Sequence, residues 1–169
     1  MSTPTANYVP PQNPGQLVLA WLRRAREAQL AHYEMANNLA RRAKWLGVPV
    51  ILITAVVGTS VFVSIVDQVV PVQAKLAIGL LSLAATILSS LQTFFKFSER
   101  AESHRVYAAR FGAIRRELEA LYARTAVAQE VGNIDALKDK LDQLAEGAPD
   151  VPPKAFRALQ KRLLRQGSA

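Results

Sequence analysis

The chain has 169 residues, of which 21 are lysine or arginine and 13 are aspartate or glutamate, so its formal net charge is +8 at pH 7. It contains no cysteine, which excludes disulfides and thiolate metal sites. A basic chain can bind nucleic acid, but no zinc-ligand spacing or aromatic RNA-binding strand accompanies this charge. We therefore expect no nucleic-acid partner, and the lipid bilayer is the better partner for the basic residues.

The N-terminal part divides into a tail and a helix. Residues 1–15 are rich in proline and have neither a basic start nor an apolar run. They predict a disordered tail rather than a cleaved signal peptide. Residues 16–44 repeat apolar side chains at spacings of three and four, which predicts an amphipathic helix with a seam toward a second helix. That seam contains Val18, Trp21, Ala25, Ala28, His32, Met35 and Leu39.

Two stretches, 45–66 and 76–95, contain no charged side chain. Roughly 20 helical residues cross the ~30 Å hydrocarbon core of a bilayer, so each stretch predicts a membrane span. The alternative is a buried helix pair of a soluble bundle, but such helices normally keep a polar stripe. Whether the first helix continues through Gly47 and Pro49 stays open, because proline removes a backbone donor.

Basic residues flank this hairpin on one side only. Arg41, Arg42 and Lys44 precede the first span, Lys96 and Arg100 follow the second, and the connecting loop holds one acid and one base. By the positive-inside rule, both termini are expected in the cytoplasm. The prediction is a multi-pass membrane protein with both termini in the cytoplasm.

A second long helix is expected to follow the loop. No proline or turn cluster interrupts residues 76–124, which predicts one continuous helix whose cytoplasmic half pairs antiparallel with 16–44. The apolar seam of this cytoplasmic half contains Phe97, Ala101, His104, Ala108, Phe111, Ile114, Leu118 and Leu121. We therefore take 16–124 as an all-α, two-span hairpin with a cytoplasmic helix pair. Residues 125–169 are expected to form short cytoplasmic helices.

The C-terminal part contains two helical patterns. Asn133 is a suitable N-cap and Gly147 a suitable stop for the first of them. The second, 154–165, is basic and amphipathic. A helix of this kind can lie on the inner leaflet or dock on the helix bundle.

Few side chains in this sequence could perform chemistry. There are two histidines and no cysteine, and no glycine-rich phosphate loop or metalloprotease motif is present. We therefore expect no enzyme, no cofactor and no metal site. His32 and His104 lie on the apolar seams of the two cytoplasmic helices. They are either packing residues or candidates for a switch that senses pH or a ligand.

A stripe of small, weakly polar residues runs along each span, at steps of three and four. It consists of Gly79, Ser82, Thr86, Ser89 and Thr93 on the second span, with Thr54 and Gly58 on the first. Small residues let helices approach closely, so one interpretation is tight packing. The other is a pore wall, because uncharged hydroxyl faces can line a gated conduit. Two helices cannot enclose water, so a pore would require a homo-oligomer.

Several segments resemble the SLATT domain. They are residues 46–52, 57–62, 88–105 and 148–153, and the similarity extends over most of the chain. The resemblance implies a two-span membrane effector of a bacterial conflict system such as anti-phage defence, placed in the bacterial inner membrane. It further implies that a nucleotide second messenger, or the separate enzyme that makes it, is the partner. It brings no catalytic residues.

Residues and resemblance together predict a homo-oligomeric pore-forming effector that a cytoplasmic signal activates and that disrupts the inner membrane. Two alternatives belong to other classes. One is a non-conducting membrane anchor or scaffold that recruits a partner enzyme. The other is a lipid-perturbing protein that acts through the C-terminal basic helix.

Overall fold

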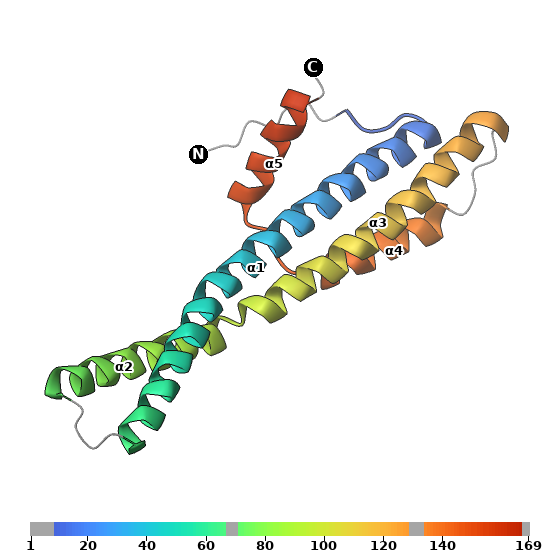
Figure 1. Cartoon of the computed structure of the whole chain (residues 1–169). Helices are drawn as coiled ribbons and strands as arrows, with labels where there is room; N and C mark the ends of the chain where they lie inside the picture. The colour runs from blue at the N-terminus through green and yellow to red at the C-terminus, as the bar shows by residue number, and fades with distance from the viewer. Residues whose placement is uncertain (1–8, 67–70, 129–133, 167–169) are drawn as a thin grey trace. The chain divides into compact units, whose positions relative to one another are not determined.

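A computed structural model describes residues 9–66, 71–128 and 134–166. All regular structure in these ranges is helical, which confirms the predicted all-α class (Figure 1). The helices are α1 (Pro14–Val66), α2 (Val72–Phe95), α3 (Phe97–Ala128), α4 (Ile134–Gly147) and α5 (Pro153–Gln166). The tail predicted at the N-terminus ends where α1 begins at Pro14, and its residues 1–8 lie outside the described part.

The helices form two compact units. Ala36–Glu102 make one, which we call the apolar unit, and Met1–Met35 with Ser103–Ala169 make the other, which we call the polar unit. The apolar unit contains the C-terminal half of α1 and all of α2. The polar unit contains the N-terminal part of α1, most of α3, and both α4 and α5.

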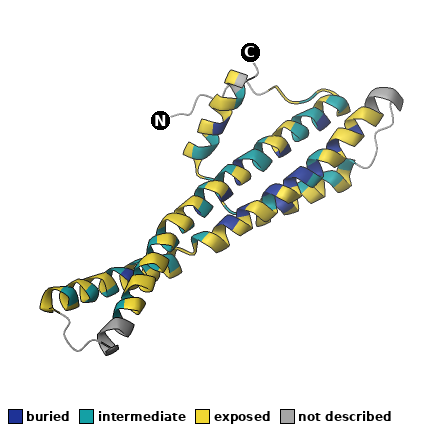
Figure 2. Ribbon diagram, viewed as in Figure 1, coloured by how far each residue is buried: buried dark blue, intermediate teal, exposed yellow. Residues whose placement is uncertain are grey.

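Both helices of the apolar unit are long and apolar enough to cross a membrane. Their most apolar windows have mean hydropathies of 1.5 and 1.8, yet only 0% and 6% of these windows is buried within the chain. A core helix of a soluble bundle would be mostly covered, whereas Ile51, Leu76 and Leu80 are each more than 60% exposed. Figure 2 shows exposed positions, in yellow, along both helices of the apolar unit. Apolar exposure on this scale requires a lipid or protein environment. Both helices are therefore candidate membrane spans.

The first helix is continuous through Pro49, which resolves the open question about this junction. Proline removes one helical hydrogen bond and costs about 3 kcal/mol in a helix interior. Along 53 residues the remaining hydrogen bonds outweigh that loss. Gly47 has a different role, because a Cβ on it would stand 3.4 Å from the side-chain amide of Gln92 on α2. This is an ordinary contact distance, so Gly47 marks a position where α1 faces the Gln92 side chain of α2.

The prediction of one continuous helix over 76–124 is wrong at a single residue. Lys96 adopts left-handed backbone angles, φ 47° and ψ 40°, and separates α2 from α3. Its N–H still donates to the carbonyl of Gln92 at 3.2 Å, and its own carbonyl accepts from Arg100 N–H at 3.0 Å. The rings of Phe95 and Phe97 stack across the break with centroids 5.1 Å apart. Residues two apart do not face each other in an α-helix, so this stack requires the interruption.

In the polar unit, α1 and α3 pack antiparallel, as predicted. His32 contacts His104, while Gln29, one turn earlier on α1, lies beside Gly112, two turns later on α3. The core consists of Val18, Ala25, Phe111, Ile114, Leu118, Leu121 and Leu144. These residues come from α1, α3 and α4, and Figure 2 colours the buried positions dark blue. All but Leu144 belong to the two predicted seams.

The two C-terminal helices complete the polar unit. Helix α4 places Leu144 in the core and pairs Lys140 with Glu117 of α3 at 2.8 Å. The N-cap predicted at Asn133 lies outside the described residues. Helix α5 turns Leu159, 5% exposed, toward protein, and its Arg162 lies 3.5 Å from Glu34 of α1. Of the two interpretations of this basic helix, the structure shows docking on the bundle.

Candidate functional site

A crevice of about 520 Å³ lies between α1 and α2 within the apolar unit. We call it the hydroxyl crevice, because five of its lining residues are serine or threonine. The full lining is Val50, Thr54, Val57, Gly58, Ser82, Ala85, Thr86, Ser89 and Ser90. None of these side chains is charged, and the surface they form is weakly polar on an apolar background.

The hydroxyl groups of the crevice donate to their own helices. Thr54 Oγ1 donates to the carbonyl of Val50 at 2.8 Å, Ser82 Oγ to Ile78 at 2.9 Å, and Thr86 Oγ1 to Ser82 at 2.9 Å. A hydroxyl that donates in this way keeps its lone pairs as acceptors. The lining therefore presents acceptor oxygens without charge, a surface that tolerates water or a partly hydrated cation better than an anion.

The structure brings together five of the seven stripe residues predicted from sequence. Thr54, Gly58, Ser82, Thr86 and Ser89 all line the hydroxyl crevice. Gly79 and Thr93 stay on the predicted helix but do not line it. Sequence reasoning missed Val50, Val57, Ala85 and Ser90 as lining residues. Spacing offered a signal for one of them, since Ser90 follows Thr86 by four residues.

The glycines of the stripe do not serve close packing within the chain. A Cβ added at Gly58 or Gly79 would meet nothing within 4 Å. In this unit it is Gly47 whose added Cβ would contact the partner helix, 3.4 Å from the Gln92 side chain. Ala85 is the buried residue of α2, while Thr54, Thr86 and Ser89 are exposed. Within one protomer the stripe is thus an open surface.

The two histidines meet in the interior of the polar unit. Nδ1 of His32 lies 2.9 Å from Nδ1 of His104, and the side chains are 4% and 2% exposed. At this distance one imidazole donates from Nδ1–H and the other accepts, so the bond requires at least one neutral ring. Burial, followed by the charge of His104, lowers the pKa of His32 from 6.5 to about 4. The pair therefore favours the neutral form of His32.

Aromatic rings surround this histidine pair. The His32 ring stacks against Phe111 with centroids 5.5 Å apart, and Tyr107 lies 6.2 Å away. The guanidinium of Arg110 lies 5.3 Å from the centre of the Tyr107 ring. Sequence placed each histidine on a seam, and the structure adds that they bond to each other. In the described ranges, no group of three or more histidine, aspartate or glutamate side chains is placed to hold a metal ion.

Comparison with known proteins gives one match. The family model for the "SMODS and SLOG-associating 2TM effector domain family 4" matches residues 26–167, most of the chain. Both apolar stretches and both histidines fall inside the matched range. No curated protein and no solved structure matches the chain.

Proposed function

The chain belongs to the SMODS and SLOG-associating 2TM effector domain family, as its resemblance to the SLATT domain indicated, and we propose that it is a pore-forming effector. In this proposal several copies assemble in the bacterial inner membrane around an axis lined by the stripe of α2. The pore stays closed until a cytoplasmic signal changes the packing of the polar unit. Membership of a two-span effector family supports action at the membrane.

The observation that carries the proposal is the open, uncharged stripe of the apolar unit. Its glycines meet no neighbour in the protomer, and its hydroxyls line a crevice that the chain's own side chains do not fill. A stripe used only to hold one hairpin together would be covered by that hairpin. Additional copies would both cover the glycine positions and close a conduit, since a ring of subunits encloses what two helices cannot.

Orientation and activation are part of the same proposal. Exposed Arg41, Arg42 and Lys44 precede the first span, and Lys96 and Arg100 follow the second, which supports cytoplasmic termini by the positive-inside rule. The signal would then reach the polar unit in the cytoplasm. A nucleotide second messenger, or the enzyme that makes it, is the partner that the family relationship favours. A signal that binds the open packing better than the closed one would shift the population toward open.

One observation favours the alternative of a non-conducting anchor. Helix α5 carries exposed basic side chains at Lys154, Arg157, Lys161 and Arg165, which could recruit an acidic protein. The lipid-perturbing alternative loses support, because Leu159 on the apolar face of α5 is already covered by protein.

Ion flux from liposomes tests the pore against the anchor. We propose to compare the full chain with Thr86→Leu, which replaces a crevice hydroxyl by a bulky apolar group, and with Ile87→Thr, a matched change outside the crevice lining. The pore proposal expects Thr86→Leu to reduce flux at least tenfold, since a hydrophobic constriction dewets, while Ile87→Thr stays near the parent value. The flux is measured at pH 5.5, where protonation weakens the histidine pair in the polar unit. Equal flux under this condition from liposomes with and without reconstituted protein would favour the anchor.

A further inference from the structure

A second cavity lies inside the polar unit, between α1, α3 and α4. Its volume is about 400 Å³, at the lower end of the range of small-molecule sites. The lining is Trp21, Arg24, Ala25, Ala28, Phe111, Lys138, Leu141, Asp142 and Ala145. We call it the α4 cavity. It shares no residue with the hydroxyl crevice, and its Phe111 also stacks against His32.

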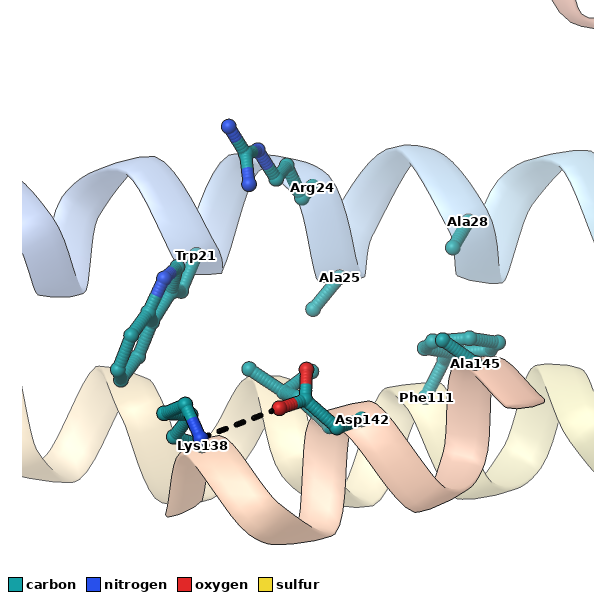
Figure 3. A pocket seen from close by; sticks show the side chains of 9 residues that line it. Trp21, Arg24, Ala25, Ala28, Phe111, Lys138, Asp142 and Ala145 are labelled. Carbon is teal, nitrogen blue, oxygen red and sulfur yellow. Dashed lines mark ion pairs between the residues drawn. The ribbon is translucent and has the colours of Figure 1, made fainter. Parts of the chain in front are cut away.

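The shape of the α4 cavity follows from small residues on opposing helices. Ala25 and Ala28 of α1 face the helix that carries Ala145, so methyl groups stand on both sides of the space (Figure 3). Trp21 extends from α1 toward the other helices, and the Phe111 ring lies beside Ala145 in the same view. Two alanine-lined walls with aromatic rings near the ends form a slot. A flat, apolar ring system fits such a slot better than a branched or polar group.

Charged groups stand at the rim of this slot. Lys138 Nζ lies 3.4 Å from Asp142 and 3.5 Å from Asp139, so the carboxylate of Asp142 is already paired. Arg24 forms no ion pair with the residues that the structure describes, and it is exposed. Arg24 belongs to the lining, and its guanidinium points away from α4 in Figure 3. The remaining unpaired charge at the rim is therefore positive.

We propose that the α4 cavity binds a small molecule with a flat aromatic body and one negatively charged group. The ring system lies between the alanine walls against Trp21 and Phe111, and the anionic group is held by Arg24. Aromatic stacking and a charge-assisted hydrogen bond are the two interactions that this lining offers. Because such a ligand bridges α1 and α4, it stabilises the packing of the polar unit shown in Figure 1.

The test uses 6-fluoro-2-naphthoate as the probe, with its neutral amide as the matched control for charge. Binding to the full chain in detergent micelles is followed by ¹⁹F NMR, and empty micelles give the background partition. We expect saturable binding of the acid with Kd of about 1 mM or tighter, as for a ligand of this size. The amide is expected to bind at least fivefold more weakly.

Three variants locate the site. Ala145→Phe fills the slot from an exposed position and should weaken binding of the acid at least tenfold, while Gln143→Phe adds the same ring to α4 outside the lining and should not. Arg24→Gln should weaken the acid about fivefold and leave the amide unchanged. Circular dichroism of each variant checks that the helices are intact.

Three outcomes would contradict the proposed binding site. No saturable binding to the parent chain, equal affinity in Ala145→Phe, or equal affinity for acid and amide would each overturn the proposal. If Ala145→Phe alters the helix content, Ala28→Leu fills the slot from α1 and replaces it. Binding is measured without conductance, so this proposal and the pore can fail separately.

Discussion

The histidine pair predicts that acid loosens the polar unit. The pKa of His32 falls from 6.5 to about 4 on folding, because the side chain is buried and lies beside His104. Between about pH 6.5 and pH 4, His32 is protonated in the unfolded or opened chain but neutral in the packed chain. Stability is therefore fully present above about pH 6.5 and is lost as the pH falls toward 4. If both histidines were protonated, both Nδ1 atoms, 2.9 Å apart, would carry a hydrogen and neither could accept the hydrogen bond.

The size of this effect follows from the pKa shift. Moving from pH 7.5 to pH 5.5 removes about 1.3 kcal/mol of stabilisation, since each pKa unit of differential binding is worth about 1.36 kcal/mol. This corresponds to an approximately tenfold rise in the population of the opened helix pair. Protonation is thus a small but measurable perturbation, well below the total stability of a typical domain.

Amide hydrogen exchange of the full chain in lipid nanodiscs measures this opening directly. Protection of the α1 and α3 amides near His32 and His104 should fall about tenfold between pH 7.5 and 5.5, after correction for the intrinsic exchange rate. His32→Gln keeps a hydrogen-bonding side chain but cannot titrate, so its protection should change less than twofold. Glu34→Gln is the control, because it removes the nearby carboxylate that pairs with Arg162 and leaves both histidines in place. Its protection should still fall about tenfold between pH 7.5 and 5.5. An identical pH response in His32→Gln would refute the reasoning.

Three further predictions concern single positions. Lys96→Gly should stabilise the protein by up to about 1 kcal/mol, because glycine adopts the left-handed backbone angles of this position without strain. Lys96→Ala should give no such stabilisation, and thermal melting followed by circular dichroism compares the two variants. Leu118→Ala, at a fully buried site, should cost about 2–5 kcal/mol in the same measurement, against less than about 0.5 kcal/mol for exposed Arg116→Ala. Gly47→Leu should clash with Gln92 and lower the melting temperature, whereas Gly58→Leu, with open space around it, should leave the melting temperature of the monomeric protein unchanged.

Much of the fold could be predicted because the apolar patterns are strong. The charge-free stretches and the period of the seams locate α1, α2 and α3, and they place Val18, Leu118 and Leu121 in the core. Helix breaks could not be predicted in the same way. Pro49 is the obvious breaker, yet α1 continues through it, while the interruption falls on Lys96, a good helix former. The Phe95–Phe97 stack that accompanies this break is a spatial contact, which residue propensity does not encode.

The candidate site, like the fold, could be predicted from the sequence only in part. Helical period alone identified a face of α2 that includes Ser82, Thr86 and Ser89. Which members line the hydroxyl crevice depends on the placement of α1 against α2, which the period does not encode, and Gly79 and Thr93 are not among them. The histidines were each predicted on a seam, but their contact needs the register between α1 and α3. The α4 cavity requires three helices at once, and sequence gave no indication of it.

The most direct test of the pore is single-channel recording. Purified full-length protein is inserted in a planar bilayer, its incorporation is confirmed, and current is recorded at pH 7.5 and at pH 5.5, where the histidine pair is weakened. We predict discrete current steps that become more frequent at pH 5.5, with a unit conductance that Thr86→Leu reduces. A bilayer that stays ion-tight at both pH values, with the protein demonstrably inserted, would contradict the proposal that this hairpin forms a pore.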